Sequence, residues 1–153
     1  MKWIQYNEKL RKSIHTGDLY FTQSDALIPT LIRFFTRSKV SHVGIFVWLG
    51  GRLFVVETTA FYGCRMLLAS QRLHEKFLLV KTHEKVTPKF VNSLLKDVYR
   101  VKYNYLGVAL ALFVSTHFTR KFCSEWVASK LHLNFKTMSR GIEPQDIYET
   151  FTK

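Results

Sequence analysis

Two apolar runs of the chain, residues 43–49 and 53–57, lie on either side of the pair Gly50 and Gly51. Both runs are rich in β-branched and aromatic residues, which favour strands. Two glycines between such runs tolerate the positive φ angles of a tight two-residue turn. The pattern therefore predicts a β-hairpin, which is the clearest element in the sequence.

Shorter apolar runs predict one strand at 19–21 and another at 77–80. The polar opening segment, to about residue 13, is expected to form a short helix or an arm. The segment from 58 to about 70 is expected to be a loop.

Helical spacing of apolar residues indicates several helices, most of them in the second half of the chain. One is expected after Thr87, a suitable N-cap, with Pro88 in its first turn. Because strands come first and helices follow, the sequence predicts an α+β fold with an antiparallel sheet. The remaining helical segments are expected near 31–35, over roughly 105–114, from about 122 to 132, and as a short turn at 143–148.

The 153-residue chain is long enough for one domain with a packed core and too short for two comfortable ones. Its 47% hydrophobic and 22% charged residues are typical of a globular protein and exclude general disorder. Neither a repeat nor a Pro-, Gly- or Ser-rich linker divides the sequence. We therefore expect a single domain over 1–153, in which 1–15 form an N-terminal arm.

The chain is strongly basic, with 23 Lys and Arg against 11 Asp and Glu and a net charge of +12. Such a charge suits an anionic partner: nucleic acid, an anionic membrane surface or an acidic polymer. The basic residues are spread along the chain without a run of five or six. Nucleic acid is therefore the less favoured of these partners.

The two cysteines, Cys64 and Cys123, are too few for a disulfide framework, although a single bridge between them stays open. The first nine residues lack the apolar core of a secretory signal. The longest apolar stretch, 106–114, is far shorter than the roughly 20 residues of a membrane-spanning helix. The expected location is the cytoplasm, with the membrane periphery as an alternative.

The hairpin carries the first chemical signal. If Gly50 and Gly51 form the turn, the strand register places Gly44 opposite Glu57 and His42 diagonally across from that glutamate. All three then share one face, and Gly44 leaves room for the carboxylate to lean toward the imidazole. A histidine oriented by a carboxylate is the base of a nucleophilic site.

Cys123 is the best candidate for the nucleophile because it is expected to open a helix. The helix dipole, together with Arg120 and Lys121 just before it, favours a thiolate there. The backbone N–H of Ser124 or of Cys123 itself is then available to a developing oxyanion.

Each of these residues also has a structural interpretation. Cys123 lies on an apolar stripe and, taken alone, fits an inert buried thiol. Glu57 fits a strand-end charge and His42 a hydrogen-bonded histidine near a turn. A zinc ion held by the same three residues uses suitable ligands, but no second close ligand pair supports it, and no metal or other cofactor is expected. The other histidines, which lack metal-ligand spacing, are interpreted as surface residues: His15, His74, His83, His117 and His132.

Four segments of the chain, 17–21, 41–45, 56–57 and 122–125, resemble the permuted papain-like branch of the NlpC-type cysteine hydrolase superfamily. That branch includes bacterial and poxviral hydrolase-like proteins and is related to lecithin–retinol acyltransferases. Its members have the histidine first, then a polar orienting residue, then the cysteine. The matches run from Gly17 to about Tyr148, and the N-terminal arm is not covered.

The resemblance implies that His42 is the base, Glu57 the orienting residue and Cys123 the nucleophile. It also implies a small antiparallel sheet or barrel packed against helices, with circularly permuted papain-like topology. The stretch 62–65 is similar to a Gly-Val-Arg segment of the family, in which Cys64 takes an apolar packing position. The late segment 144–147 is similar to a structural Pro-x-Asp-Leu element.

The expected activity is a cysteine hydrolase that cleaves an amide, thioester or ester bond through an acyl-cysteine intermediate, or an acyltransferase of the same type. The substrate classes of the family are peptides, peptidoglycan-derived peptides and lipids. Four basic residues near the site favour an anionic substrate or membrane surface: Arg37, Lys39, Arg120 and Lys121. The alternative is a non-catalytic basic module of the same fold that contacts an anionic membrane or nucleic acid.

Overall fold

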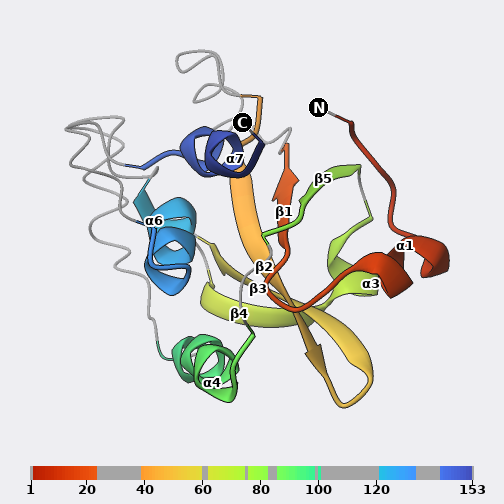
Figure 1. Ribbon diagram of the computed structural model, residues 1–153, viewed down its shortest axis with the longest axis horizontal. Coiled ribbons are helices and arrows are strands. Elements are labelled where there is room, and N and C mark those ends of the chain that lie inside the picture. The colour runs from red at the N-terminus through yellow and green to blue at the C-terminus, as the bar shows by residue number, and fades with distance from the viewer. Residues whose placement is uncertain are drawn as a thin grey trace.

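The computed structural model describes residues 2–23, 39–59, 62–74, 76–82, 86–98, 100, 121–133 and 142–152. These residues form an antiparallel sheet with the strand order β4-β3-β2-β1-β5, flanked by helices (Figure 1). The fold is therefore α+β, as predicted. The strands are β1 (Leu19–Thr22), β2 (His42–Leu49), β3 (Arg52–Thr59), β4 (Gly63–Leu68) and β5 (Phe77–Val80). The helices are α1 (Glu8–Ser13), α3 (Ala69–Arg72), α4 (Pro88–Asp97), α6 (Lys121–Lys130) and α7 (Pro144–Thr152).

The predicted hairpin is confirmed in both its turn and its register. Gly50 and Gly51 have φ angles of +53° and +73°, which a residue with a side chain adopts only with strain. The β2–β3 ladder runs from the pair Leu49–Arg52 next to the turn to the pair Gly44–Glu57 at its far end. The predicted strands at 19–21 and 77–80 are also confirmed, as β1 and β5.

The expected loop from 58 to 70 is wrong. The structure has the end of β3, the edge strand β4 and the short helix α3 in this segment. Gly63, with a φ of +65°, lets the chain reverse so that it pairs with Thr59. Most of β4 is only half-buried, so its sequence lacks the alternation that predicts a strand.

The helix expected after Thr87 is present as α4, and the Thr87 hydroxyl accepts a hydrogen bond from the Phe90 N–H at 3.1 Å. The helix expected at 122–132 is α6. The short turn expected at 143–148 is longer than predicted and forms α7. The helices expected near 31–35 and 105–114 lie outside the described residues.

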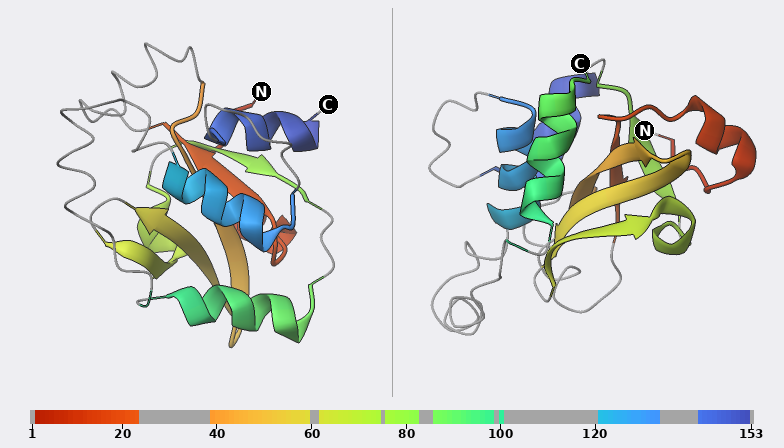
Figure 2. Two further views of the ribbon diagram at one scale, coloured as in Figure 1. Left: turned by 90° about the vertical axis from the view of Figure 1, so that its left-hand side faces the viewer. Right: turned by 90° about the horizontal axis from the view of Figure 1, so that it is seen from below.

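Two apolar clusters cover opposite faces of the sheet. One face carries Leu19 and Phe21 and packs against α4, α6 and α7. The other carries Tyr20 and Phe46 and packs against α1 and α3. Figure 2 shows this division, with α4 and α6 on one side of the curved strands and α1 on the other.

The N-terminal segment is attached to the sheet. Ile4 and Phe77 exchange backbone hydrogen bonds of 2.8 and 2.9 Å, and α1 begins after Asn7, whose side chain caps it. Trp3 packs against the apolar cluster beneath α6 and α7. Among the described residues, every helix is too short or too polar to cross a membrane.

Candidate active site

The hairpin brings His42 and Glu57 into direct contact. His42 is the first residue of β2, and its Nε2 atom lies 2.8 Å from Oε2 of Glu57. The Glu57 carboxyl group is fully buried, and 15% of the His42 side chain is exposed. The interpretation of Glu57 as only a strand-end charge therefore does not fit the structure, because the carboxyl group is buried against His42. Because Nε2 faces the carboxylate, Nδ1 is the ring nitrogen left for another partner.

The space above Gly44 is filled by Tyr20 rather than by Glu57. A Cβ atom at position 44 would lie 2.5 Å from Cε1 of Tyr20, which is well inside contact distance. Strand pairing explains this, because Tyr20 in β1 lies opposite Gly44 in β2. The Tyr20 hydroxyl donates a hydrogen bond to Oε2 of Glu57. The room that the sequence assigned to the carboxylate thus holds a second hydrogen-bond donor to it.

Two arginines complete the surroundings of Glu57. Arg65 donates to Oε1 from Nε at 2.8 Å and from Nη2 at 2.6 Å. Arg72 donates from Nε to Oε1 at 3.0 Å and to Oε2 at 2.9 Å. Arg65 lies directly opposite Glu57 in the β3–β4 ladder, and Arg72 is the last residue of α3. The buried carboxylate is therefore held by four side chains from four elements.

This environment keeps Glu57 ionised. Burial alone raises the pKa of its carboxyl group, but the hydrogen bond and charge of His42, the charge of Arg72 and the Tyr20 hydroxyl outweigh it. The pKa of Glu57 is consequently well below its usual range. Tyr20 behaves in the opposite sense, because burial and the nearby carboxylate raise the pKa of its hydroxyl.

Cys123 meets the other side of the histidine. It lies in the first turn of α6, which packs against β2 and β3, and its thiol is within hydrogen-bonding reach of the His42 ring. Burial raises the pKa of this thiol, but His42 and the backbone N–H groups of Val43 and Ser124 lower it by more. Its net pKa is therefore below the ordinary value.

His42 shows the matching change. Burial lowers the pKa of its imidazole, yet hydrogen bonds and charges from Cys123 and Glu57 raise it to about 9. A depressed thiol pKa and an elevated imidazole pKa describe one coupled pair, which favours thiolate and imidazolium over the neutral groups. Such a pair is a nucleophile with a proton donor beside it.

The structure describes only some of the remaining site residues predicted from the sequence. The backbone N–H of Ser124 faces the Cys123 sulfur, while its hydroxyl donates to the Ile142 carbonyl at 2.6 Å. Lys39 is exposed three residues before His42. Lys121 is the first residue of α6, and its side chain lies outside the described part, as do Arg37 and Arg120.

Cys64 has a different environment from Cys123. It is fully buried in the apolar cluster beneath α6, and both cysteines are free thiols, so the open alternative of a bridge between them does not fit the structure. Burial raises the pKa of Cys64 to about 11. This thiol is the less reactive of the two at neutral pH.

Sequence reasoning missed Tyr20, Arg65 and Arg72. Opposite charges in directly paired strand positions are a usable signal, and Glu57 and Arg65 form such a pair. That signal required β4 to be recognised as a strand. To predict Tyr20 as a site residue, the pairing of β1 with β2 had to be known, and no short turn specifies that pairing. Arg72, on a four-residue helix, had no sequence signal.

Comparison with known proteins identifies a similar fold and no family. No family model and no curated protein matches the chain. A crystal structure from Escherichia coli O157:H7, described as metalloprotein yiiX of DUF1105, superposes with a TM-score of 0.58 at 19% identity and covers 80% of this chain and 67% of that one. In the described part of the present chain, no group of three or more His, Cys, Asp or Glu residues is arranged to hold a metal ion. At this level of identity the likeness is one of fold.

Proposed function

We propose that this protein is a cysteine hydrolase of the permuted papain-like type that forms an acyl-enzyme on Cys123. The observation that carries the proposal is the arrangement of Cys123, His42 and Glu57 as thiol, imidazole and buried carboxylate. The chain order of these residues, histidine before cysteine, and the antiparallel sheet agree with the resemblance found in the sequence.

The reaction follows from these groups. The Cys123 thiolate attacks the carbonyl carbon of an amide, ester or thioester, and the carbonyl electrons move onto oxygen. The Ser124 N–H, which already faces the sulfur, is the candidate donor to that oxyanion. As the oxyanion collapses, the bond to the leaving group breaks and imidazolium His42 donates its proton to that group. A thioester and a neutral imidazole remain.

The second half-reaction releases the acid. Neutral His42 takes a proton from water as the water attacks the thioester. The bond between the acyl carbon and the Cys123 sulfur then breaks, and the thiolate and imidazolium pair is restored. Glu57 keeps Nε2 of His42 engaged throughout, which leaves Nδ1 as the ring nitrogen for these proton transfers. The proposed substrates are peptides, peptidoglycan-derived peptides or lipids that carry an acyl bond and negative charge.

The test is a panel of acyl ester, thioester and peptide probes, with the protein analysed by intact mass after each reaction. The proposal predicts a covalent acyl adduct on wild-type protein and on Cys64→Ala, and none on Cys123→Ala. If the adduct persists in Cys123→Ala, or if no probe in the panel reacts with wild type, the assignment fails.

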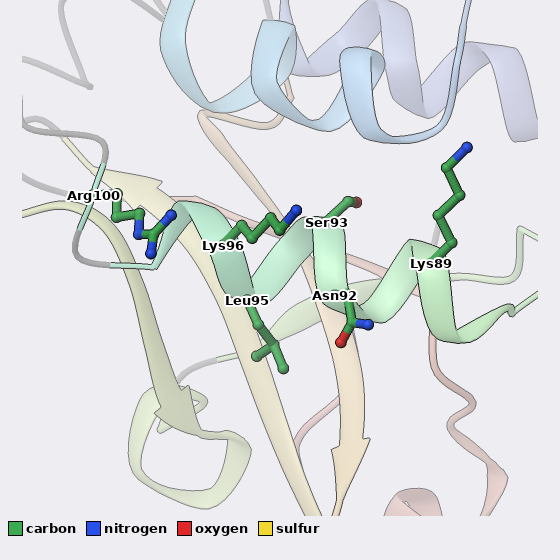
Figure 3. A pocket seen from close by; sticks show the side chains of 6 residues that line it. All are labelled: Lys89, Asn92, Ser93, Leu95, Lys96 and Arg100. Carbon is green, nitrogen blue, oxygen red and sulfur yellow. The ribbon is translucent and has the colours of Figure 1, made fainter.

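The second candidate function is the non-catalytic basic module, and one surface favours it. A hollow of about 680 Å³ is lined by Lys89, Asn92, Ser93, Leu95, Lys96 and Arg100 (Figure 3). Lys89, Ser93 and Lys96 extend from one side of α4 in this view. The acidic residue of the helix, Asp97, is already paired with Lys130 at 2.7 Å.

This hollow has the charge to contact an anionic membrane surface, since three cationic side chains line it without a lining acid. Salt-sensitive binding to phosphatidylserine vesicles that survives Cys123→Ser and is lost in Lys89→Gln/Lys96→Gln would support this function. Equal binding by that double variant would refute the role of α4.

A further inference from the structure

The surroundings of Glu57 contain more positive charge than the carboxylate can balance. Arg65 binds Oε1 with two N–H groups, and Arg72 lies between the two oxygens. Only Oε2 also faces His42. One negative charge is thus shared by two guanidinium groups and one imidazole.

The excess of cations has a chemical consequence for the histidine. A buried carboxylate bound to an imidazolium alone would hold the proton firmly, because both charges interact in a medium of low dielectric constant. A base that cannot release its proton cannot protonate a leaving group. The two guanidiniums weaken this hold in two ways, by drawing on the charge of Glu57 and by repelling the imidazolium.

We propose that Arg65 and Arg72 are positioning residues: they fix Glu57 beside His42 and offset its charge, so that His42 can both gain and release a proton during the reaction. The inference rests on the proposed function for its catalytic meaning. The effect of these charges on the protonation of His42 follows from the contacts of Glu57 and does not depend on the proposed reaction.

Four groups from four elements face the His42–Glu57 unit, and each bears on its titration. They are Tyr20 of β1, Arg65 of β4, Arg72 of α3 and Cys123 of α6. The backbone N–H of Val43 in β2 faces the Cys123 sulfur instead. Tyr20 is neutral and Cys123 is the titrating partner, so Arg65 and Arg72 are the fixed charges of the set. The Arg72 guanidinium also lies 5.8 Å from the centre of the Tyr20 ring.

The test follows the titration of the His42 ring by NMR and the pH dependence of Cys123 alkylation in Arg72→Gln, neither of which needs a substrate. Loss of the cation is expected to raise the titration midpoint of His42 and that of the Cys123 thiol, each by about one pH unit. Arg72→Lys should restore both midpoints, because it returns the charge.

The matched control is Arg52→Gln, which removes one positive charge from an exposed position at the turn end of β3. It should leave both midpoints unchanged. If Arg72→Gln does not fold by circular dichroism, Arg65→Gln carries the same prediction, because the Arg65 guanidinium also offsets the charge of Glu57.

Three results would overturn the inference. The titration midpoints of His42 and Cys123 in Arg72→Gln could equal those of the control, or the His42 midpoint could fall. Either result would mean that these arginines have only a structural role. Failure of Arg72→Lys to restore the midpoints would show that charge is not the cause. If the midpoints move as expected but no probe acylates Cys123, the proposed function fails while this inference stands.

Discussion

Replacing Glu57 by glutamine tests the centre of the site, because it removes one charge and little volume. The carboxylate accepts from His42, Tyr20, Arg65 and Arg72, and it is fully buried. An amide in its place has one acceptor oxygen and a donor NH₂ group. The NH₂ group would face an arginine or the histidine, donor against donor.

The two ion pairs of Glu57 with Arg65 and Arg72 determine how much stability Glu57→Gln loses. Removing one partner of a buried ion pair typically costs about 3–5 kcal/mol, because a charge is left unpaired. Here the arginines keep 23% and 26% of their side chains exposed and regain part of their hydration. We therefore expect Glu57→Gln to lower the free energy of unfolding by about 3 kcal/mol, toward the low end of that range.

The effect on the cysteine is separate. Without the carboxylate, only Cys123 opposes the effect of burial on the imidazole, so the pKa of His42 falls from its raised value of about 9. The imidazolium then stabilises the Cys123 thiolate less. Alkylation of Cys123 at about pH 6 should slow by about tenfold or more, which corresponds to one pKa unit of the thiol.

The assays are urea denaturation at neutral pH and the rate of Cys123 alkylation. The matched control is Glu8→Gln, since Glu8 pairs with Arg11 on the surface and its side chain is 76% exposed. That change should cost less than about 1 kcal/mol and leave alkylation unchanged. A Glu57→Gln protein that is as stable as the control and is alkylated at the wild-type rate would show that the Glu57 carboxylate neither stabilises the fold nor activates Cys123.

Three further predictions concern the same residues. Gly44→Ala places a methyl group 2.5 Å from Tyr20 Cε1 and should cost about 1–3 kcal/mol in urea denaturation; an unchanged midpoint would mean that the ring moves freely. Tyr20→Phe removes a hydrogen bond to the charged Oε2 and should cost about 1.5–3 kcal/mol without altering the charge near His42, so wild-type stability would contradict the contact. Because the pKa of Glu57 is lowered in the folded protein, its stabilising contribution is fully present above its ordinary value of 4.5, decreases progressively as pH falls below that value, and is lost completely only below the lowered pKa of the folded state. Denaturation curves between about pH 5 and pH 3 should therefore converge for wild type and Glu57→Gln, and parallel losses would contradict the assignment.

The part of the site that the sequence predicted is the part encoded by a short turn. Gly50 and Gly51 leave one register for β2 and β3, and that register determines that His42 and Glu57 share a face. Cys123 was a candidate from its expected place at a helix start, but its link to His42 required the family resemblance, because the contact of Cys123 with β2 depends on how α6 packs. The antiparallel sheet followed from the order of strands and helices.

The surroundings of Glu57 depend on contacts between segments distant in sequence. The pairing of β1 with β2 brings Tyr20 over Gly44, and α3 places Arg72 beside a residue fifteen positions earlier. No local sequence pattern predicts either contact. Arg65 was within reach of pattern reasoning, but the half-buried edge strand that carries it resembled a loop.

Limiting alkylation of the wild-type protein at about pH 6 measures whether Cys123 is an activated thiol. Cys64, buried and with its pKa raised to about 11, is the internal reference in the same molecule. Cys123 is expected to react at least about tenfold faster than a free model thiol, and His42→Ala is expected to abolish the difference. A Cys123 that reacts no faster than the model thiol, or whose rate is unchanged in His42→Ala, would contradict this expectation.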